Sequence, residues 1–154
     1  MNDVIFQASD LATKRVEFLH AARAGTARLR DKDGTSLVML PEQTLEFLET
    51  LAAWSAHHLR LQELVSRGVP PSISDLGNLA WLRAFDAADL HEFVRELHDS
   101  LIAALADRST DALDETVRAW QVTARELEDP LRRSILMNDH SGADYIEAER
   151  PDEQ

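Results

Sequence analysis

The stretch Gly68-Val-Pro-Pro-Ser72 is the feature that most constrains the fold of this chain. Proline lacks a backbone N–H and its ring clashes with the preceding helical turn, so no helix or central strand continues through two consecutive prolines. Before this break, some segments repeat apolar residues with a period of two and others with a helical period, whereas after it only the helical period occurs. The sequence therefore predicts an α+β fold with a mixed N-terminal part and an all-helical C-terminal part.

The break divides the chain into four predicted segments. We expect a strand, helix, hairpin and helix module over residues 1–67, a linker over 68–78, a helical domain over 79–137 and an acidic tail over 138–154. A chain of 154 residues has the usual size of a single domain or of two small ones. The tail is poor in apolar residues and is expected to be flexible.

The first residues predict a strand followed by a helix. Val4–Phe6 is a short apolar run, Ser9 is a suitable N-cap residue, and Gly25 is suited to end a helix that runs to Ala24. The apolar residues expected on the buried side of this helix are Leu11, Val16, Leu19 and Ala22.

A hairpin and a second helix are predicted next. Apolar residues alternate with arginines in Thr26–Arg30, and Leu37–Leu40 is an apolar strand. Asp33 and Gly34 between them favour a tight turn, because both tolerate a positive φ. Pro41 suits the first position of a helix. The residues expected on its apolar face are Leu45, Leu48, Leu51, Trp54, Leu59, Leu61 and Leu64.

The second half predicts two helices and a short third one. Asp86, Asp89 and the apolar pair Phe85 and Leu90 form the start signal of a helix. Its expected buried residues are Leu90, Phe93, Leu97, Leu101 and Leu105, and those of the following helix are Leu113, Val117, Trp120, Ala124 and Leu127. A break at 109–111 makes the two helices an antiparallel pair, closed by a short helix after Pro130.

Charge is distributed unevenly along the chain. The formal net charge is −12. Residues 1–33 carry six basic and five acidic side chains, whereas residues 34–154 carry ten basic and twenty-three acidic ones. This asymmetry suits a protein with two partners, one a polyanion and the other basic.

No motif points to an enzyme or to a bound cofactor. The five glycines are too scattered to form a phosphate loop, and no nucleophile elbow, dinucleotide fingerprint or zinc-protease signature occurs. The chain has no cysteine. Glu17 and His20 form a single Glu-x-x-His pair, and the pattern gives His57, His58, His91 and His98 no metal role either.

Trp54, Trp81 and Trp120 lie in apolar helical patterns and are expected in the core. Without a long apolar stretch or a secretory signal, a cytoplasmic location without membrane contact is expected.

The order of motifs in residues 2–52 resembles the Phd/YefM antitoxin family. The motifs are a short strand, Ser9-Asp10 opening a helix, Gly25, a strand with basic residues, a turn ending in Gly34, an apolar strand and Pro41-Glu42 opening a helix. The resemblance implies a homodimer in which two such modules share one sheet and core and bind the toxin–antitoxin operator. The DNA-binding residues that it implies are Lys14, Arg15, Arg28, Arg30 and Lys32. It also implies that the segment beyond the module binds and neutralises a cognate toxin.

Two stretches of the helical part, Leu79–Asp86 and Arg118–Ala124, resemble extensions that follow antitoxin-like modules in actinobacterial proteins. The leading hypothesis is therefore the antitoxin of a type II toxin–antitoxin system, a homodimeric DNA-binding autorepressor whose acidic C-terminal part occupies the toxin. The alternative is an orphan dimeric adaptor or regulatory protein without a toxin partner.

Overall fold

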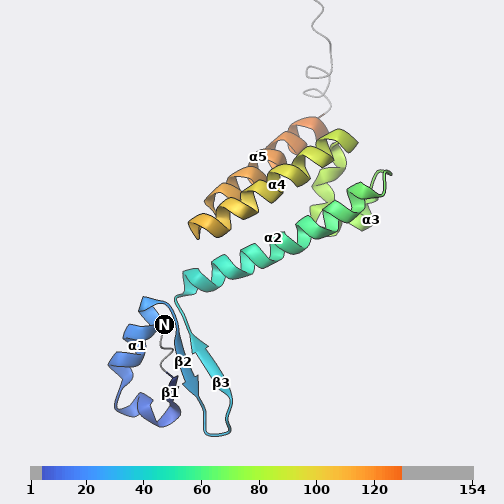
Figure 1. Cartoon of the computed structure of the whole chain (residues 1–154). Helices are drawn as coiled ribbons and strands as arrows, with labels where there is room; N and C mark the ends of the chain where they lie inside the picture. Colours follow the sequence, from blue (N-terminus) through green and yellow to red (C-terminus); the bar gives the residue numbers. More distant parts are fainter. Residues whose placement is uncertain (1–4, 130–154) are drawn as a thin grey trace, which may run out of the picture. The chain divides into compact units, whose positions relative to one another are not determined.

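The three-dimensional structure is a computed structural model that describes residues 5–129. These residues form a three-stranded sheet, five α-helices and two 3₁₀ helices, which confirms the predicted α+β class (Figure 1). Contacts between residues divide the chain into two compact units. Of the described residues, the sheet unit holds 5–60 and 98–113, and the helical unit holds 61–97 and 114–129. The predicted acidic tail and the short helix after Pro130 lie outside the described residues.

The sheet has β2 (Ala27–Arg30) at its centre. β1 (Ile5–Gln7) pairs with β2 in parallel, and β3 (Ser36–Met39) pairs with β2 in antiparallel orientation. The register places Phe6 and Leu37 on either side of Leu29. The strands were predicted at these places because apolar side chains in a half-buried strand recur at every second residue.

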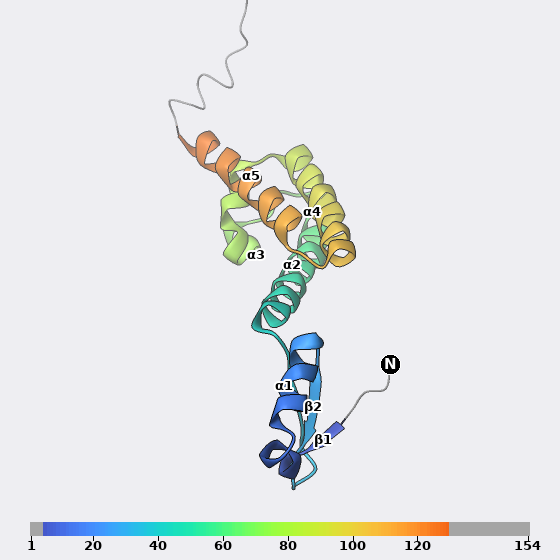
Figure 2. The same cartoon turned by 90° about the vertical axis from the view of Figure 1, so that its left-hand side faces the viewer.

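Helix α1 (Arg15–Ala24) covers one face of this sheet, beside which it lies in both Figure 1 and Figure 2. Phe18 and Ala22 are buried together with Phe6 and Ala27. The rings of Phe6 and Phe18 meet edge to face, with centroids 5.3 Å apart and an interplanar angle of 89°. Such aromatic pairs stabilise a fold beyond the area that they bury. This small cluster is the core of the module.

The predicted start of the first helix is wrong. The chain first forms the 3₁₀ helix η1 (Ala8–Ala12), in which the Gln7 N–H donates to Oδ2 of Asp10 at 2.9 Å, so Ser9 is not the cap. α1 begins only at Arg15, because the chain leaves helical geometry around Lys14 (φ −115°, ψ 27°). The interruption resets the helical phase, so Phe18 is buried and Val16 is 77% exposed.

The hairpin turn has a different geometry from the one expected. The Gly34 N–H donates to the Asp31 carbonyl at 3.0 Å, and the Asp31 N–H donates to the Thr35 carbonyl at 2.8 Å. Gly34 has a φ of +90°, while Asp33 keeps a negative φ. This is the pattern of a longer loop closed by one left-handed glycine, not of a two-residue turn that needs two positive φ values.

Helix α2 (Glu42–Ser66) has the predicted extent, but the single apolar face expected for it is wrong. Leu61 and Leu64 are buried, whereas Leu45, Leu48 and Leu59 are 46%, 50% and 66% exposed. At 3.6 residues per turn, Leu61 lies about 160° around the helix from Leu45. Leu45 and Leu61 therefore point in nearly opposite directions.

Two short helices follow the proline pair in the helical unit. α3 (Ile73–Leu76) lies within the stretch expected as a linker and is capped by Ser72, whose Oγ accepts from the Asp75 N–H at 3.1 Å. It continues into the 3₁₀ helix η2 (Gly77–Ala84). Leu79 and Leu82 of η2 are 4% and 0% exposed, so this segment contributes to the core of the helical unit.

Helices α4 (Ala87–Asp107) and α5 (Asp111–Glu128) are joined by a turn at the predicted break. The start signal of α4 is confirmed, since the Asp89 N–H donates to Oδ1 of Asp86 at 2.9 Å and the Asp86 N–H donates to Oδ2 of Asp89 at 3.3 Å. Arg108 in the turn has a φ of +53°, the left-handed conformation that often ends a helix.

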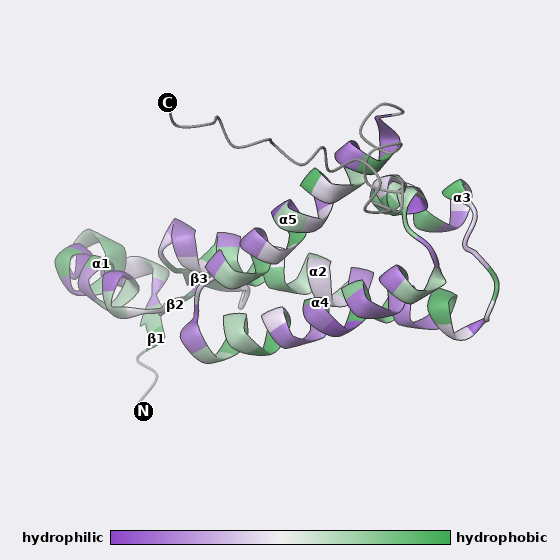
Figure 3. Ribbon diagram, turned by 90° about the horizontal axis from the view of Figure 1, so that it is seen from above, coloured by the Kyte–Doolittle hydropathy of each residue, from purple (hydrophilic) through white to green (hydrophobic). Residues whose placement is uncertain are grey.

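One face of α4 is buried along its length. Figure 3 shows hydrophobic and hydrophilic residues side by side on α4 and α5, as expected for amphipathic helices. The buried residues of α4 include Leu90, Phe93, Leu97, Leu101 and Ala104. The predicted Leu105 is 56% exposed, because it lies about 80° around the helix from the centre of this face. In α5, Leu113, Val117 and Ala124 are buried as predicted.

We expect Phe93→Ala to lower the free energy of unfolding by about 3–5 kcal/mol, because it leaves a cavity beneath two tryptophans. Phe93 is 0% exposed, and its ring centroid lies 5.5 Å from that of Trp81 and 5.3 Å from that of Trp120. Urea denaturation followed by circular dichroism measures the change. Val122→Ala on α5 is the control, since a 46% exposed side chain should change the value by less than about 0.5 kcal/mol. Equal losses in both variants would contradict this assignment of the core.

Candidate functional site

Arg28 and Arg30 lie on the sheet face that α1 leaves uncovered. Side chains alternate along β2, so Ala27 and Leu29 face α1 and the two arginines point to the other side. The register places Ile5 and Val38 beside Arg28, and Gln7 and Ser36 beside Arg30. None of the strand positions described on this face is acidic. The strand positions on the uncovered face therefore combine two arginines with apolar and uncharged polar side chains.

Lys14 and Arg15 lie at the start of α1, which packs on the opposite face of the sheet. Nζ of Lys14 lies 3.6 Å from Oδ1 of Asp10, which offsets part of its charge. Arg15 is exposed as the first residue of α1. The structure thus brings Arg28 and Arg30 together on one face and places Lys14 and Arg15 elsewhere.

Lys32 lies in the hairpin loop between two aspartates. Its backbone N–H donates to Oδ1 of Asp31 at 2.6 Å, and the Thr35 N–H donates to Oδ1 of Asp33 at 2.8 Å. The bond from Thr35 lowers the pKa of Asp33, so this carboxylate stays charged at neutral pH. The loop around Lys32 is consequently less basic than the face that carries the two arginines.

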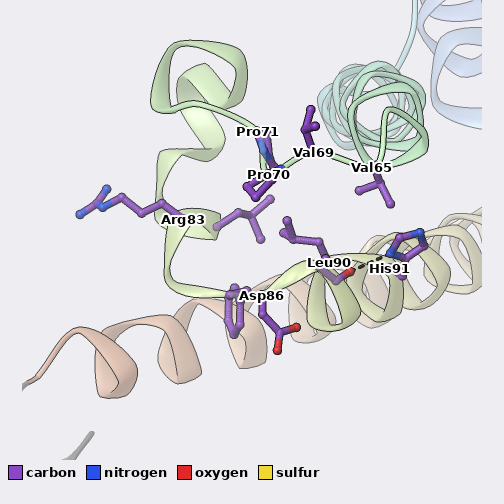
Figure 4. Close-up of a pocket in the computed structure, with 12 residues that line it drawn as sticks. Val65, Val69, Pro70, Pro71, Arg83, Asp86, Leu90 and His91 are labelled. Atoms are coloured by element: carbon purple, nitrogen blue, oxygen red, sulfur yellow. Dashed lines mark hydrogen bonds between the residues drawn. The ribbon is translucent and has the colours of Figure 1, made fainter.

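The helical unit contains an apolar cavity of about 280 Å³ (Figure 4). It lies between the end of α2, the proline-containing loop, η2 and the start of α4. Val65 and Leu90 point into it, whereas Arg83 extends away from the other labelled side chains (Figure 4). His91 at its edge contacts the Ala87 carbonyl through Nδ1 at 2.7 Å. The volume is near the lower limit for a small-molecule site, and the lining has few polar groups to orient a ligand.

A second hollow in the same unit combines aromatic rings with carboxylates. It is an open groove of about 540 Å³ between the start of α4 and the side of α5. The residues that line it include Phe85, Asp86, Asp89, Trp120, Thr123 and Leu127. We call it the aromatic groove. Its chemistry suits a cation that carries apolar surface, because aromatic faces and carboxylates both attract positive charge.

Two histidines, His58 of α2 and His98 of α4, lie together in the sheet unit. Their ring centroids are 5.3 Å apart with an interplanar angle of 36°. Partial burial, followed by the neighbouring His98, lowers the pKa of His58 from its ordinary value of 6.5. Protonation of His58 is thus disfavoured in the folded protein.

Sequence reasoning missed both the aromatic groove and the histidine pair. Trp120 is only partly buried, and it was expected to lie in the core because its helical spacing is the same for a core residue and for a groove residue. Forty residues separate His58 from His98, and no local pattern brings them together. Asp86 and Asp89 were found through their capping signal alone.

Comparisons of the chain with models of known protein families, with curated proteins and with solved structures give no match. Across residues 5–129, no helix is both long enough and apolar enough to cross a bilayer. Nor does this part of the chain bring three histidine, aspartate or glutamate side chains close enough together to hold a metal ion. The site must therefore be judged from its own geometry.

We expect acid to destabilise the protein partly through His58. A histidine whose pKa is lower in the folded state binds a proton more readily when unfolded, so its contribution is fully present above about pH 6.5 and is lost as the pH falls through the lowered value. Urea denaturation between about pH 7.5 and about pH 5 should show that His58→Gln loses less stability than the unmodified protein. His20→Gln, which removes a histidine of α1, is the control. An identical pH dependence in His58→Gln and the unmodified protein would show that the pair does not contribute.

Proposed function

We propose that this protein is the antitoxin of a type II toxin–antitoxin system, a homodimeric DNA-binding autorepressor that neutralises a basic toxin through its acidic C-terminal part. The observation that carries the proposal is the exposure of apolar side chains on β3, an edge strand that lies beside the arginine-bearing β2. The order of β1, α1, β2, β3 and α2 also follows the order that the resemblance to the Phd/YefM family implies.

β3 exposes apolar side chains on both of its sides. Leu37, Val38 and Met39 are 48%, 51% and 44% exposed. Leu37 and Met39 are paired with the α1-facing residues of β2, and Val38 is paired with Arg28 on the other face. Among the described residues β3 also lies at the edge of the sheet, with β2 as its one neighbouring strand. An exposed apolar edge of this kind favours pairing with another strand, and a second copy of the chain supplies one.

A second copy also increases the positive charge near the sheet. Each copy contributes Arg28 and Arg30, whose positions on β2 are about 6–7 Å apart. Guanidinium groups bind phosphates through paired hydrogen bonds, and the release of counterions from DNA favours such contacts. Two-fold symmetry matches two sets of arginines to the two halves of a palindromic operator. The exposed Lys14, Arg15 and Lys32 are the further candidates for phosphate contacts.

The helical unit has the charge expected of a toxin-binding part. Its described residues carry eleven acidic and five basic side chains. Surface charge of one sign speeds association with an oppositely charged partner and disfavours nucleic acid. DNA and a basic protein are therefore assigned to different parts of the chain.

One observation favours the adaptor as the second candidate function. Leu82 and Phe93 are both 0% exposed, so the helical unit has a core of its own and is more than a short toxin-binding segment. An adaptor would use this unit without a toxin and without operator DNA. Affinity purification with the neighbouring gene co-expressed separates the two functions, because only the antitoxin retains the product of that gene.

Val38→Glu is expected to convert the dimer to a monomer, because it buries a charge at the proposed strand pairing. Sedimentation equilibrium gives the mass, and circular dichroism shows whether the variant is folded. Val122→Glu, at a similarly exposed valine of α5, is the control and should stay dimeric. A monomeric unmodified protein, or a dimeric Val38→Glu variant, would disprove the proposed interface.

Arg28→Ala combined with Arg30→Ala should weaken binding to the DNA upstream of the gene by at least about tenfold, since each arginine contact is worth about 1–3 kcal/mol. Gel-shift titration at two salt concentrations measures the affinity, and its salt dependence should become shallower. The matched control is Arg95→Ala with Arg118→Ala, two exposed arginines of α4 and α5. Unchanged affinity in the Arg28 and Arg30 double variant would rule out this DNA-binding face.

A further inference from the structure

The aromatic groove has a floor whose shape is fixed before any ligand arrives. Phe85 and Trp120 meet at an angle of 69° with ring centroids 4.9 Å apart, and Phe93 supports the same indole at 5.3 Å. Nε1 of Trp120 donates to Oε2 of Glu96 at 2.7 Å. The indole is thus held by two rings and one hydrogen bond. A fixed side chain loses little conformational entropy when a partner binds to it.

The rim of the groove carries two carboxylates that are also fixed. Asp86 and Asp89 each accept one hydrogen bond from the backbone N–H of the other residue, at 2.9 and 3.3 Å. Each bond engages a single oxygen of its carboxylate. Both charges therefore stay beside the aromatic floor without further ordering.

An arginine side chain matches this combination of groups. Its planar guanidinium stacks on an aromatic ring and can bind a carboxylate through two parallel hydrogen bonds. A groove of about 540 Å³ has room for such a side chain together with its neighbours on a partner. The surplus of acidic residues in the helical unit attracts a basic protein and repels nucleic acid.

We propose that the aromatic groove is the docking site of a basic protein partner, which stacks an arginine on Trp120 and pairs it with Asp86 and Asp89. The inference rests on the proposed function, because it specifies the chemistry by which the acidic part holds a basic toxin. Arginine and tryptophan are the residues that most often dominate the binding energy of an interface.

The experiment measures binding of the full-length protein to a fluorescently labelled amphipathic peptide that carries several arginines. A second peptide has citrulline at the same places, which keeps the shape of arginine and removes its charge. We expect the arginine peptide to bind at least about tenfold more tightly, as about 1.4 kcal/mol corresponds to a factor of ten. Asp86→Asn with Asp89→Asn should lose this preference, although asparagine can still accept both capping bonds.

The matched control is Asp99→Asn with Asp107→Asn, which removes two charges from α4 outside the groove. This variant should keep the preference for arginine. Equal binding of the two peptides to the unmodified protein, or equal losses in the two double variants, would overturn the proposal. The comparison of peptides on the unmodified protein decides the matter even where a variant fails to fold. Neither DNA nor the β3 interface enters this measurement, so a failed gel shift and a failed docking site are distinguishable.

Discussion

Within residues 5–129, the main α-helical contact of the sheet is with one short helix, α1, and this constraint shapes the rest of the module. α1 has ten residues and is about 15 Å long. Its Phe18 and Ala22 cover β1 and β2, where Phe6 and Ala27 are buried, and leave the apolar side chains of β3 exposed. The module therefore has an incomplete core and an arginine-bearing face on the same three strands. The incomplete core favours pairing with an apolar strand, and the arginine-bearing face favours binding of a polyanion.

The sequence predicted the elements better than their burial. The strands and α2 were found because alternation, the Gly34 turn and Pro41 are local signals that neighbouring residues determine. The start of α1 was misplaced because Asp10 bonds back to Gln7 and ends a separate short turn. In α2 the leucines were assigned to one face, although Leu45 and Leu61 lie on nearly opposite sides. Apolar residues at helical spacing predict an apolar helix face, but they do not show that another element covers that face.

The sequence predicted less of the candidate sites than of the fold. Arginine positions on β2 could be predicted, because alternation alone decides that Arg28 and Arg30 share a face. The aromatic groove could not be predicted, because Phe85, at the end of η2, and Trp120 of α5 come together only in the folded chain. Their local patterns are those of ordinary core residues. A site formed by residues far apart in sequence becomes visible only when the packing of the helices is known.

The proposed pairing of β3 with a second copy has a consequence for the amount of protein in the cell. Pairing through β3 would make the stability of the module depend on protein concentration, because dimerisation shifts the folding equilibrium by mass action. Scarce chains would then be less well folded and more readily degraded, whereas abundant chains would protect one another. The bare edge of a three-stranded sheet would in this way make the protein a sensor of its own abundance.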